Sequence, residues 1–164
     1  TEKRNFGEKD FLKFHPGGTL GQRLMSRVKE AMITGERIPR VFAGSPALEA
    51  VEEIDRRNLG FVLITDRRDR LKGILTDGDV RRCVKRGVRF EAIPVDEIMT
   101  KTPRTIDENA TLAKTVETME TLEITTLVVT GKGNTLKGYI HLHDIFGRGG
   151  TLRISIPSAN GREA

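Results

Sequence analysis

The sequence is organised around one stretch, Gly73-Ile74-Leu75-Thr76-Asp77-Gly78-Asp79-Val80, which has a counterpart at Gly138-Tyr139-Ile140-His141-Leu142-His143-Asp144-Ile145. Each copy reads as an aliphatic strand that runs into the first turn of a helix. In the first copy the Thr76 hydroxyl stands three residues before the Asp79 carboxylate. Backbone N–H groups at a helix N-terminus attract phosphate, a threonine hydroxyl can bond a phosphate oxygen, and a carboxylate accepts protons from sugar hydroxyls. These residue types predict a site for a ligand that carries both phosphate and ribose.

Composition limits the class of protein. The 164 residues suffice for one domain or for two small domains that share a core. Hydrophobic residues make up 37% and charged residues 31% of the chain, which is a soluble globular composition. The apolar runs are strand-sized and too short to cross a bilayer. One cysteine, Cys83, allows no intrachain disulfide, and the first residues lack a signal-peptide pattern, so we expect a cytoplasmic protein.

The charge balance indicates the kind of partner. A net charge of +5 suits small anionic ligands as well as nucleic acid. Aromatic residues are only 5% of the chain, there is no tryptophan and no recognition-helix motif is present, which disfavours nucleic acid. We therefore expect a small-molecule ligand, and neither nucleic acid nor a membrane as a partner.

Most of the chain is an internal repeat, which is the first feature to seek in a sequence. Val28-Lys29-Glu30-Ala31-Met32 matches Val95-Asp96-Glu97-Ile98-Met99, and Leu71-Lys72-Gly73 matches Leu136-Lys137-Gly138. Two copies are too few for a solenoid, so the repeat predicts a paired module with pseudo-twofold symmetry. The fold class is α/β (α+β), with the order β-α-β-β-α occurring twice.

The expected elements follow from apolar spacing and from turn residues. In the first copy we expect strands at 39–42, 60–65 and 70–76, a helix capped by Ser45 with Pro46 in its first turn, and a helix at 78–86. In the second copy we expect strands at 103–106, 125–130 and 135–141, a helix capped by Asn109, and a short helix at 142–146.

The ends of the chain carry weaker signals. We expect a short helix at 8–14 and a helical pattern over 19–25, with Leu20, Leu24 and Met25 on one face. The predicted division is a connector at 1–27, a first domain at 28–92, a second domain at 93–150 and a C-terminal tail at 151–164.

The repeat resembles a tandem pair of CBS (cystathionine β-synthase) domains, a Bateman module, over roughly residues 28–150. A narrower resemblance, to the C-terminal half of D-arabinose-5-phosphate isomerases of the KpsF/GutQ type, rests on four motifs in the same order. They are His15-Pro16-Gly17-Gly18-Thr19-Leu20-Gly21, Met32-Ile33-Thr34-Gly35-Glu36-Arg37-Ile38-Pro39, Thr76-Asp77-Gly78-Asp79-Val80-Arg81-Arg82 and His141-Leu142-His143-Asp144.

In that family an N-terminal sugar-isomerase (SIS) domain converts ribulose 5-phosphate to arabinose 5-phosphate for Kdo and lipopolysaccharide synthesis. The residues before His15 resemble only the last helix of such a domain. The resemblance therefore implies a regulatory CBS pair that is not an enzyme by itself. Its partners would be the SIS domain of the same polypeptide and further copies of the chain, as a homodimer or tetramer through the CBS pairs.

The resemblance also implies roles for site residues. Thr76 would bind phosphate and Asp79 would accept ribose hydroxyls. The second copy keeps Asp144 but has His141 in place of the threonine, so its site is either altered in ligand or empty. The simpler alternative is that Thr76 only ends a strand and Asp79 only favours the helix dipole.

Two further groups of residues carry competing interpretations. Arg81 and Arg82 follow Asp79 closely and can reach a second phosphate or a carboxylate, or they are part of a solvated helix face. His141, His143 and Asp144 are conceivable metal ligands. Zinc, however, takes four ligands, or three and a water. We expect no metal and place both histidines in the ligand cleft.

His15 is the one candidate catalytic residue. By resemblance, it would reach into the isomerase active site of a neighbouring subunit in the full-length protein, where acid–base chemistry suits a histidine. The alternative is a turn residue before Pro16 and two glycines. Cys83 is expected on the buried face of its helix as a small apolar residue.

Three functions are compared. The first is a sensor that binds a regulatory ligand in clefts between the two copies. The candidate ligands are AMP, ATP and the nucleotide sugar CMP-Kdo, and no other cofactor is expected. The second is a purely structural module that holds catalytic domains together without ligand. The third, an independent enzyme, is disfavoured because no nucleophile–base pair stands at catalytic spacing.

Overall fold

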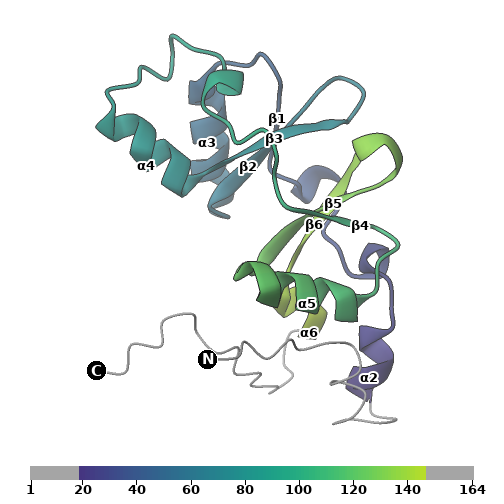
Figure 1. Ribbon diagram of the computed structural model, residues 1–164. Coiled ribbons are helices and arrows are strands. Elements are labelled where there is room, and N and C mark those ends of the chain that lie inside the picture. Colours follow the sequence, from purple (N-terminus) through teal and green to yellow (C-terminus); the bar gives the residue numbers. More distant parts are fainter. Residues whose placement is uncertain (1–18, 147–164) are drawn as a thin grey trace, which may run out of the picture. The chain divides into compact units, whose positions relative to one another are not determined.

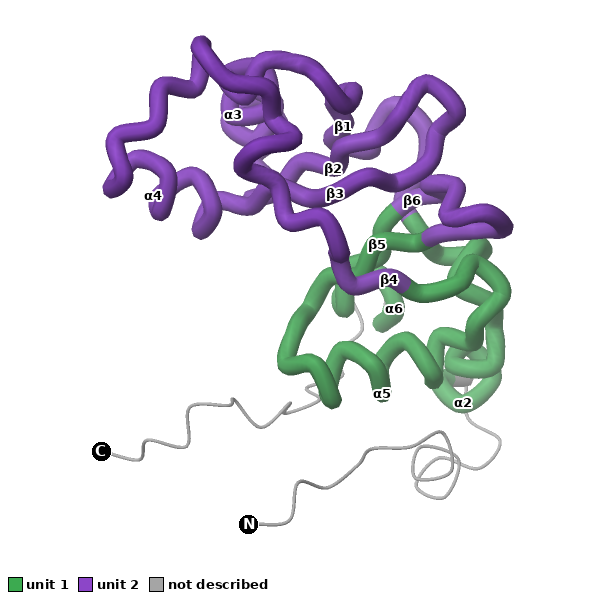
Figure 2. Tube along the Cα trace, turned by 45° about the horizontal axis from the view of Figure 1, so that its top comes forward, with its two compact units in different colours: residues 1–32, 106–129, 139–164 green, residues 33–105, 130–138 purple. Residues whose placement is uncertain are grey.

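The computed structural model describes residues 19–146 of the chain. The helix expected at 8–14, His15 and the tail at 151–164 lie outside the described residues. The chain divides into two compact units, coloured separately in Figure 2. Among the described residues, unit 1 takes 19–32, 106–129 and 139–146, and unit 2 takes Ile33–Thr105 and Thr130–Gly138.

Unit 2 is built on a three-stranded sheet in the order β1-β2-β3 (Figure 1). Strand β1 (Arg40–Phe42) lies parallel to β2 (Phe61–Thr65), and the helix α3 (Ala47–Arg57) makes the crossover that a parallel pair requires. Strand β3 (Leu71–Thr76) lies antiparallel to β2 and leads directly into helix α4 (Asp77–Lys85).

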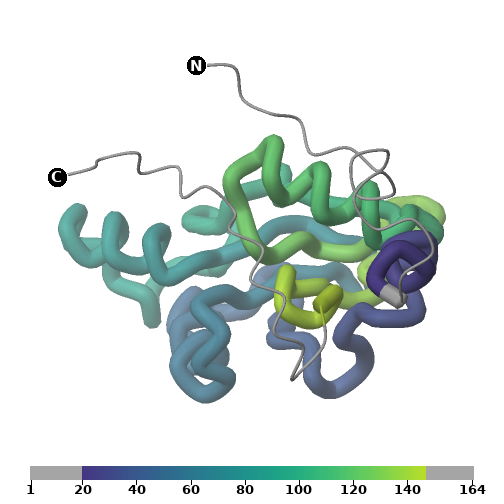
Figure 3. The backbone as a smooth tube through the Cα atoms, turned by 90° about the horizontal axis from the view of Figure 1, so that it is seen from below, coloured from purple at the N-terminus to yellow at the C-terminus, as the bar shows by residue number. Residues whose placement is uncertain are grey.

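The second sheet repeats this order as β4-β5-β6, and most of its residues belong to unit 1. Its strands are β4 (Thr105–Asp107), β5 (Thr126–Thr130) and β6 (Leu136–His141). Helix α5 (Leu112–Leu122) follows β4, and the short α6 (Leu142–Phe146) follows β6, as the yellow end of the tube in Figure 3 shows. The predicted β-α-β-β-α order, present twice, is confirmed.

Shorter helices complete the part of the chain that the structure describes. Helix α2 (Thr19–Leu24) precedes the first repeat. Four 3-10 turns, η1 to η4, lie at Val28–Glu30, Gly35–Arg37, Val95–Glu97 and Lys132–Asn134.

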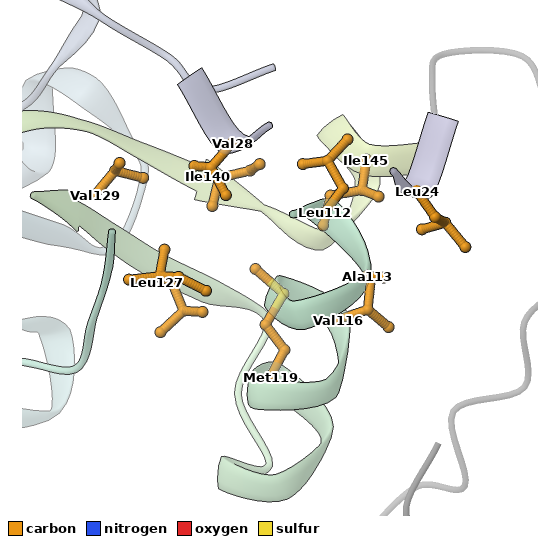
Figure 4. Close-up of a cluster of buried hydrophobic side chains, with 11 residues drawn as sticks. Leu24, Val28, Leu112, Ala113, Val116, Met119, Leu127, Val129, Ile140 and Ile145 are labelled. Atoms are coloured by element: carbon orange, nitrogen blue, oxygen red, sulfur yellow. The ribbon is translucent and has the colours of Figure 1, made fainter. Parts of the chain in front are cut away.

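Each unit has its own apolar core. In unit 2, Ala50 and Ile54 of α3 pack on Val62, Ile64 and Leu75 of the sheet, together with Val95. In unit 1, one face of α5 packs on β5 and β6, as the side chains in Figure 4 show. Those α5 residues are Leu112, Ala113, Val116 and Met119, at the spacing of a single helix face.

The segment that opens the first repeat packs in unit 1. Val28 is fully buried in the core around α5. Its N–H donates to the Ala110 carbonyl at 2.9 Å, and the Leu112 N–H donates to the Ser26 carbonyl at 2.9 Å. Residues 28–32 therefore belong spatially with 106–129, far along the chain.

The matching segment of the second repeat packs in unit 2 with the same hydrogen bonds. The Val95 N–H donates to the Ser45 carbonyl at 2.8 Å, and the Ala47 N–H donates to the Ile93 carbonyl at 2.8 Å. The sequence match between Val28 and Val95 thus has a structural counterpart. The domain boundaries at 28–92 and 93–150 remain a prediction about the repeats, because each spatial unit contains residues of both.

Three local predictions were wrong. Helix α3 begins after Pro46, so Ser45 lies one residue before the cap position and no side-chain cap bond forms, while its carbonyl accepts the Val95 N–H. The cap of α5 is Thr111, whose hydroxyl accepts the Lys114 N–H, whereas the Asn109 N–H donates to Asp107. Met25 lies beyond the end of α2 and is 45% exposed, so it shares no buried face with Leu24.

The other helix and strand boundaries differ from the predicted ones by at most two residues. The predicted strands at 39–42, 60–65, 70–76, 125–130 and 135–141 each begin one residue later in the structure, and the strand expected at 103–106 is shifted to Thr105–Asp107. The helix expected at 78–86 is shifted by one residue toward the N-terminus. The short helix at 142–146 is confirmed as expected, as is the burial of Cys83.

Gly73 allows the backbone at Met99 and Thr100 to pass close beside β3. The Ile74 N–H donates to the Thr100 carbonyl at 2.9 Å, and the Thr100 N–H donates to the Ile74 carbonyl at 2.8 Å. A Cβ atom at Gly73 would lie 2.8 Å from the Thr100 carbonyl oxygen and 2.6 Å from the Met99 sulfur. The glycine that opens the repeated motif therefore permits a close backbone approach.

Replacing Gly73 by alanine is expected to destabilise the protein by about 1–3 kcal/mol, because the new methyl group must push this pairing apart. The measurement is the free energy of unfolding in urea. Lys72→Ala is the control: Lys72 is exposed on the same strand, and its loss should change stability by less than about 0.5 kcal/mol. Equal stability of the two variants would contradict the close approach.

Candidate functional site

The strand-to-helix junction between β3 and α4 is held by a reciprocal pair of hydrogen bonds. The Asp79 N–H donates to the Thr76 hydroxyl at 3.3 Å, and the Thr76 N–H donates to the Asp79 carboxylate at 2.9 Å. This is a capping box, in which the side chain of the N-cap residue, Thr76, and that of the third helical residue, Asp79, each accept the other residue's backbone N–H. The spacing of threonine and aspartate in the sequence produces it directly.

The Asp79 carboxylate receives two more donors. The Thr76 hydroxyl donates to its Oδ2 at 2.9 Å, and Arg82 donates from Nη2 to its Oδ1 at 2.5 Å. The Asp79 side chain is only 14% exposed, whereas that of Arg82 is 67% exposed. Both carboxylate oxygens are therefore occupied and the charge is neutralised by one guanidinium.

Two glycines shape the surface around this carboxylate. Gly60 has a φ of +81°, a conformation that favours glycine, and its carbonyl accepts the Asp77 N–H at 3.0 Å. A Cβ atom at Gly78 would lie 3.4 Å from Nη1 of Arg82. The Arg82 guanidinium thus lies over the first turn of α4, next to the glycine.

Other cations lie on α4 or just after its end. Arg81 is exposed and makes no ion pair among the residues that the structure describes. Lys85, Arg86 and Arg89 are also exposed. The structure therefore brings Arg82, and not Arg81, onto Asp79.

The second copy builds the same junction with a histidine. The His141 N–H donates to the Asp144 carboxylate at 2.9 Å, as the Thr76 N–H does to Asp79. The His143 N–H donates to Nδ1 of His141 at 3.2 Å, so the imidazole takes the part of the threonine hydroxyl. The rings of His141 and His143 are 3.8 Å apart between centroids.

The surroundings of His141 favour its neutral form. Burial lowers the pKa of His141 below its ordinary value of 6.5; the charge of His143 lowers it further, and Asp144 opposes the shift. Because Nδ1 accepts a hydrogen bond, the neutral ring carries its proton on Nε2. This side chain can thus offer one donor, and at neutral pH it does not supply a positive charge.

Arg23 is a residue that the sequence did not indicate. It donates from Nη2 to the Asp144 carbonyl at 2.9 Å and from Nε to the Ile145 carbonyl. A cation at the carbonyl groups of a short helix suits the helix dipole. The only local signal was a basic residue in the last turn of α2, which is too common to predict a contact so far along the chain.

Residues 19–146 contain no group of three or more His, Cys, Asp or Glu side chains placed to hold a metal ion. Within the same residues, no helix combines the length and the apolar character that a membrane crossing requires. His15, the candidate catalytic residue, lies outside the described part of the chain, so its role stays a prediction.

The sequence matches the family model of the CBS domain over residues 28–86 and 95–149, which is more than half of the chain. The chain belongs to the CBS domain family. The two matched stretches correspond to the two repeats, and the predicted tandem CBS fold is confirmed by the paired βαββα architecture. The junctions at Asp79 and Asp144 each close one repeat of this CBS pair.

The chain is also similar to sugar-phosphate isomerases. It is 35% identical over 148 residues to the arabinose 5-phosphate isomerase KdsD of Pseudomonas aeruginosa, covering 90% of this chain and 45% of that protein. The KdsD of Yersinia pestis is 36% identical over 146 residues, covering 89% of this chain and 44% of that protein. The CBS pair thus spans less than half the length of these relatives, and the resemblance seen in the motifs is confirmed.

Solved structures share the fold. A CBS domain protein of Pyrobaculum aerophilum complexed with AMP aligns with a TM-score of 0.62 and 20% identity, over 73% of this chain and 89% of that one. The CBS domain pair of protein MJ0100, in complex with 5′-methylthioadenosine and S-adenosyl-L-methionine, aligns with a TM-score of 0.62 and 20% identity, over 74% of this chain and 94% of that one. At such identities the likeness concerns the fold alone.

The lowered pKa of His141 predicts a pH dependence of stability. Above pH 6.5 the ring is neutral in both the folded and unfolded chain, and its cap contributes fully. As the pH falls from 6.5 through the lower folded pKa, the unfolded chain binds the proton more readily and that contribution is lost. As the pH is lowered from 7.5 to 5.5, the free energy of unfolding of the wild type is expected to fall relative to that of His141→Thr.

Threonine at 141 restores the hydroxyl of the first repeat without a titrating group, so the titration of His15 cancels in the comparison, whereas that of His143 is coupled to the change. Urea unfolding of both proteins at several pH values measures the difference, which is bounded by the worth of a helix cap, about 0.5–2 kcal/mol. A difference that is independent of pH, or one that moves in favour of the wild type on acidification, would contradict the neutral imidazole cap.

Proposed function

We propose that this CBS pair is a regulatory module that binds a nucleotide or a nucleotide sugar at the β3–α4 junction. One observation carries the proposal: a hydroxyl, a carboxylate and a guanidinium, from Thr76, Asp79 and Arg82, meet at the first turn of α4. They do so in a CBS domain, a fold in which other proteins hold AMP or S-adenosyl-L-methionine.

The chemistry of each group fits a part of such a ligand. Ribose hydroxyls can donate to the Asp79 carboxylate, which then releases the Thr76 hydroxyl. The freed hydroxyl and the first N–H groups of α4 can donate to a phosphate oxygen. Arg81 and Arg82 supply positive charge for a second phosphate or for a carboxylate.

Several ligands satisfy this pattern. AMP and ATP bring ribose and phosphate. CMP-Kdo brings ribose, phosphate and a carboxylate, and it would report on the end product if the attached enzyme acts in Kdo and lipopolysaccharide synthesis. At the second junction, His141, His143 and Asp144 offer two imidazoles and one carboxylate in place of the hydroxyl and the guanidinium, so that site would take a different ligand or none.

The isomerase relatives suggest what the module regulates. We propose that the CBS pair is attached to a SIS domain that interconverts sugar phosphates, with His15 contributing only within that larger protein. The CBS pair would not be catalytic by itself. Ligand binding would shift the isomerase between states through a difference in affinity for those states. The dimer or tetramer and the cytoplasmic location expected from the sequence remain predictions.

A second candidate is a purely structural module. It is favoured by the observation that Thr76 and Asp79 already satisfy each other as a helix cap. Under this alternative the chain forms a stable oligomer that no nucleotide changes.

Isothermal titration calorimetry with AMP, ATP and CMP-Kdo distinguishes the two candidates. The sensor predicts binding of at least one of them with a Kd below about 1 mM. Asp79→Asn keeps the shape of the cap but removes the charge, and is expected to weaken binding by about tenfold or more. Asp77→Asn, an exposed carboxylate in the same turn, is the matched control and should leave affinity unchanged.

The structural module predicts that none of the three ligands binds the wild type. It also predicts that sedimentation velocity shows an oligomer whose size the ligands do not change. Equal affinities of the Asp79→Asn and Asp77→Asn proteins would show that the Asp79 carboxylate does not contribute to ligand binding.

A further inference from the structure

Two donors at the β3–α4 junction already hold one anion. The Thr76 hydroxyl donates to Oδ2 of Asp79 at 2.9 Å, and Nη2 of Arg82 donates to Oδ1 at 2.5 Å. The two donors are therefore spaced to bind two oxygens of one anionic group. A phosphate presents pairs of oxygens at a separation similar to that of a carboxylate, so these donors also suit a phosphate.

Gly78 keeps side-chain atoms away from these two donors. The place that a Cβ atom would occupy at Gly78 is 3.7 Å from Nη2 of Arg82 and 3.7 Å from the Thr76 hydroxyl oxygen. The guanidinium and the hydroxyl thus both border a position that carries no side chain, at the first turn of α4.

Little packing opposes a change of partner by Arg82. Its side chain is 67% exposed, and its one ion pair among the described residues is with Asp79. Asp79 by contrast is largely enclosed and is fixed by the backbone N–H of Thr76. If a ligand displaces this ion pair, the arginine and not the aspartate changes position.

We infer that Arg82 makes the site selective for phosphorylated ligands, because it covers the Asp79 carboxylate in the free chain and transfers from that carboxylate to the phosphate of the ligand. The inference rests on the proposed function. An uncharged nucleoside must compete with the guanidinium for Asp79 and offers it no anion in return. A nucleoside phosphate supplies that anion, so the broken ion pair is replaced by a new one.

The second junction lacks this device. Asp144 has no ion pair to its carboxylate among the described residues, because Arg23 donates to backbone carbonyls instead. Selection by charge is therefore a property of the first repeat.

Calorimetric titration of the 164-residue chain with AMP and with adenosine tests the inference. The wild type is expected to bind AMP at least about tenfold more tightly than adenosine. In Arg82→Gln the affinity for AMP should fall by about tenfold, while that for adenosine stays the same or rises, since Asp79 is no longer covered. The ratio of the two affinities should therefore collapse toward one.

Lys85→Gln is the matched control. It removes the same charge one turn along α4, from an exposed side chain, and should leave the ratio unchanged. If Arg82→Gln keeps the wild-type ratio, or weakens both ligands equally, the inference is overturned while the proposed function stands. If the wild type binds neither AMP nor adenosine, the inference and adenine-nucleotide binding fail together.

Discussion

The carboxylate at the start of the last helix in each repeat is the interaction on which the rest of the structure depends. Asp79 accepts the backbone N–H of the residue that ends β3, and Asp144 does the same for β6. Each carboxylate joins a buried strand to a helix and fixes the turn between them. This explains why the aspartate is common to both copies. The side chain that ends the strand differs: the Thr76 hydroxyl accepts the Asp79 N–H, whereas Nδ1 of His141 accepts the His143 N–H.

The same groups serve stability and the proposed binding, which constrains how the site can work. In the free chain the hydroxyl, the carboxylate and the guanidinium satisfy one another, so the junction needs no ligand to be stable. Binding then exchanges existing hydrogen bonds for new ones and gains only their difference. Modest affinity suits a sensor, because its occupancy must follow changes in ligand concentration.

Local patterns in the sequence predicted most of the fold. The strands, the helices and their repeated order follow from apolar spacing and turn residues, and the aliphatic strand that runs into a helix start indicated the junction. The reciprocal cap between Thr76 and Asp79 was not predicted. Contacts between residues that are far apart in the sequence could not be predicted from local patterns. Val28 packs with α5, the Ser45 carbonyl accepts the Val95 N–H, and Arg23 reaches α6. For the site, the residue types were predictable, but which of two adjacent arginines pairs with Asp79 depends on helix geometry.

A double-mutant cycle on Thr76 and Asp79 tests the central claim most directly. The free energy of unfolding is measured for wild type, Thr76→Ala, Asp79→Ala and the double variant. If the two side chains cap α4 jointly, the single losses are not additive, and the coupling energy is about 0.5–2 kcal/mol. Losses that add within about 0.3 kcal/mol would show two independent residues and would contradict a shared cap.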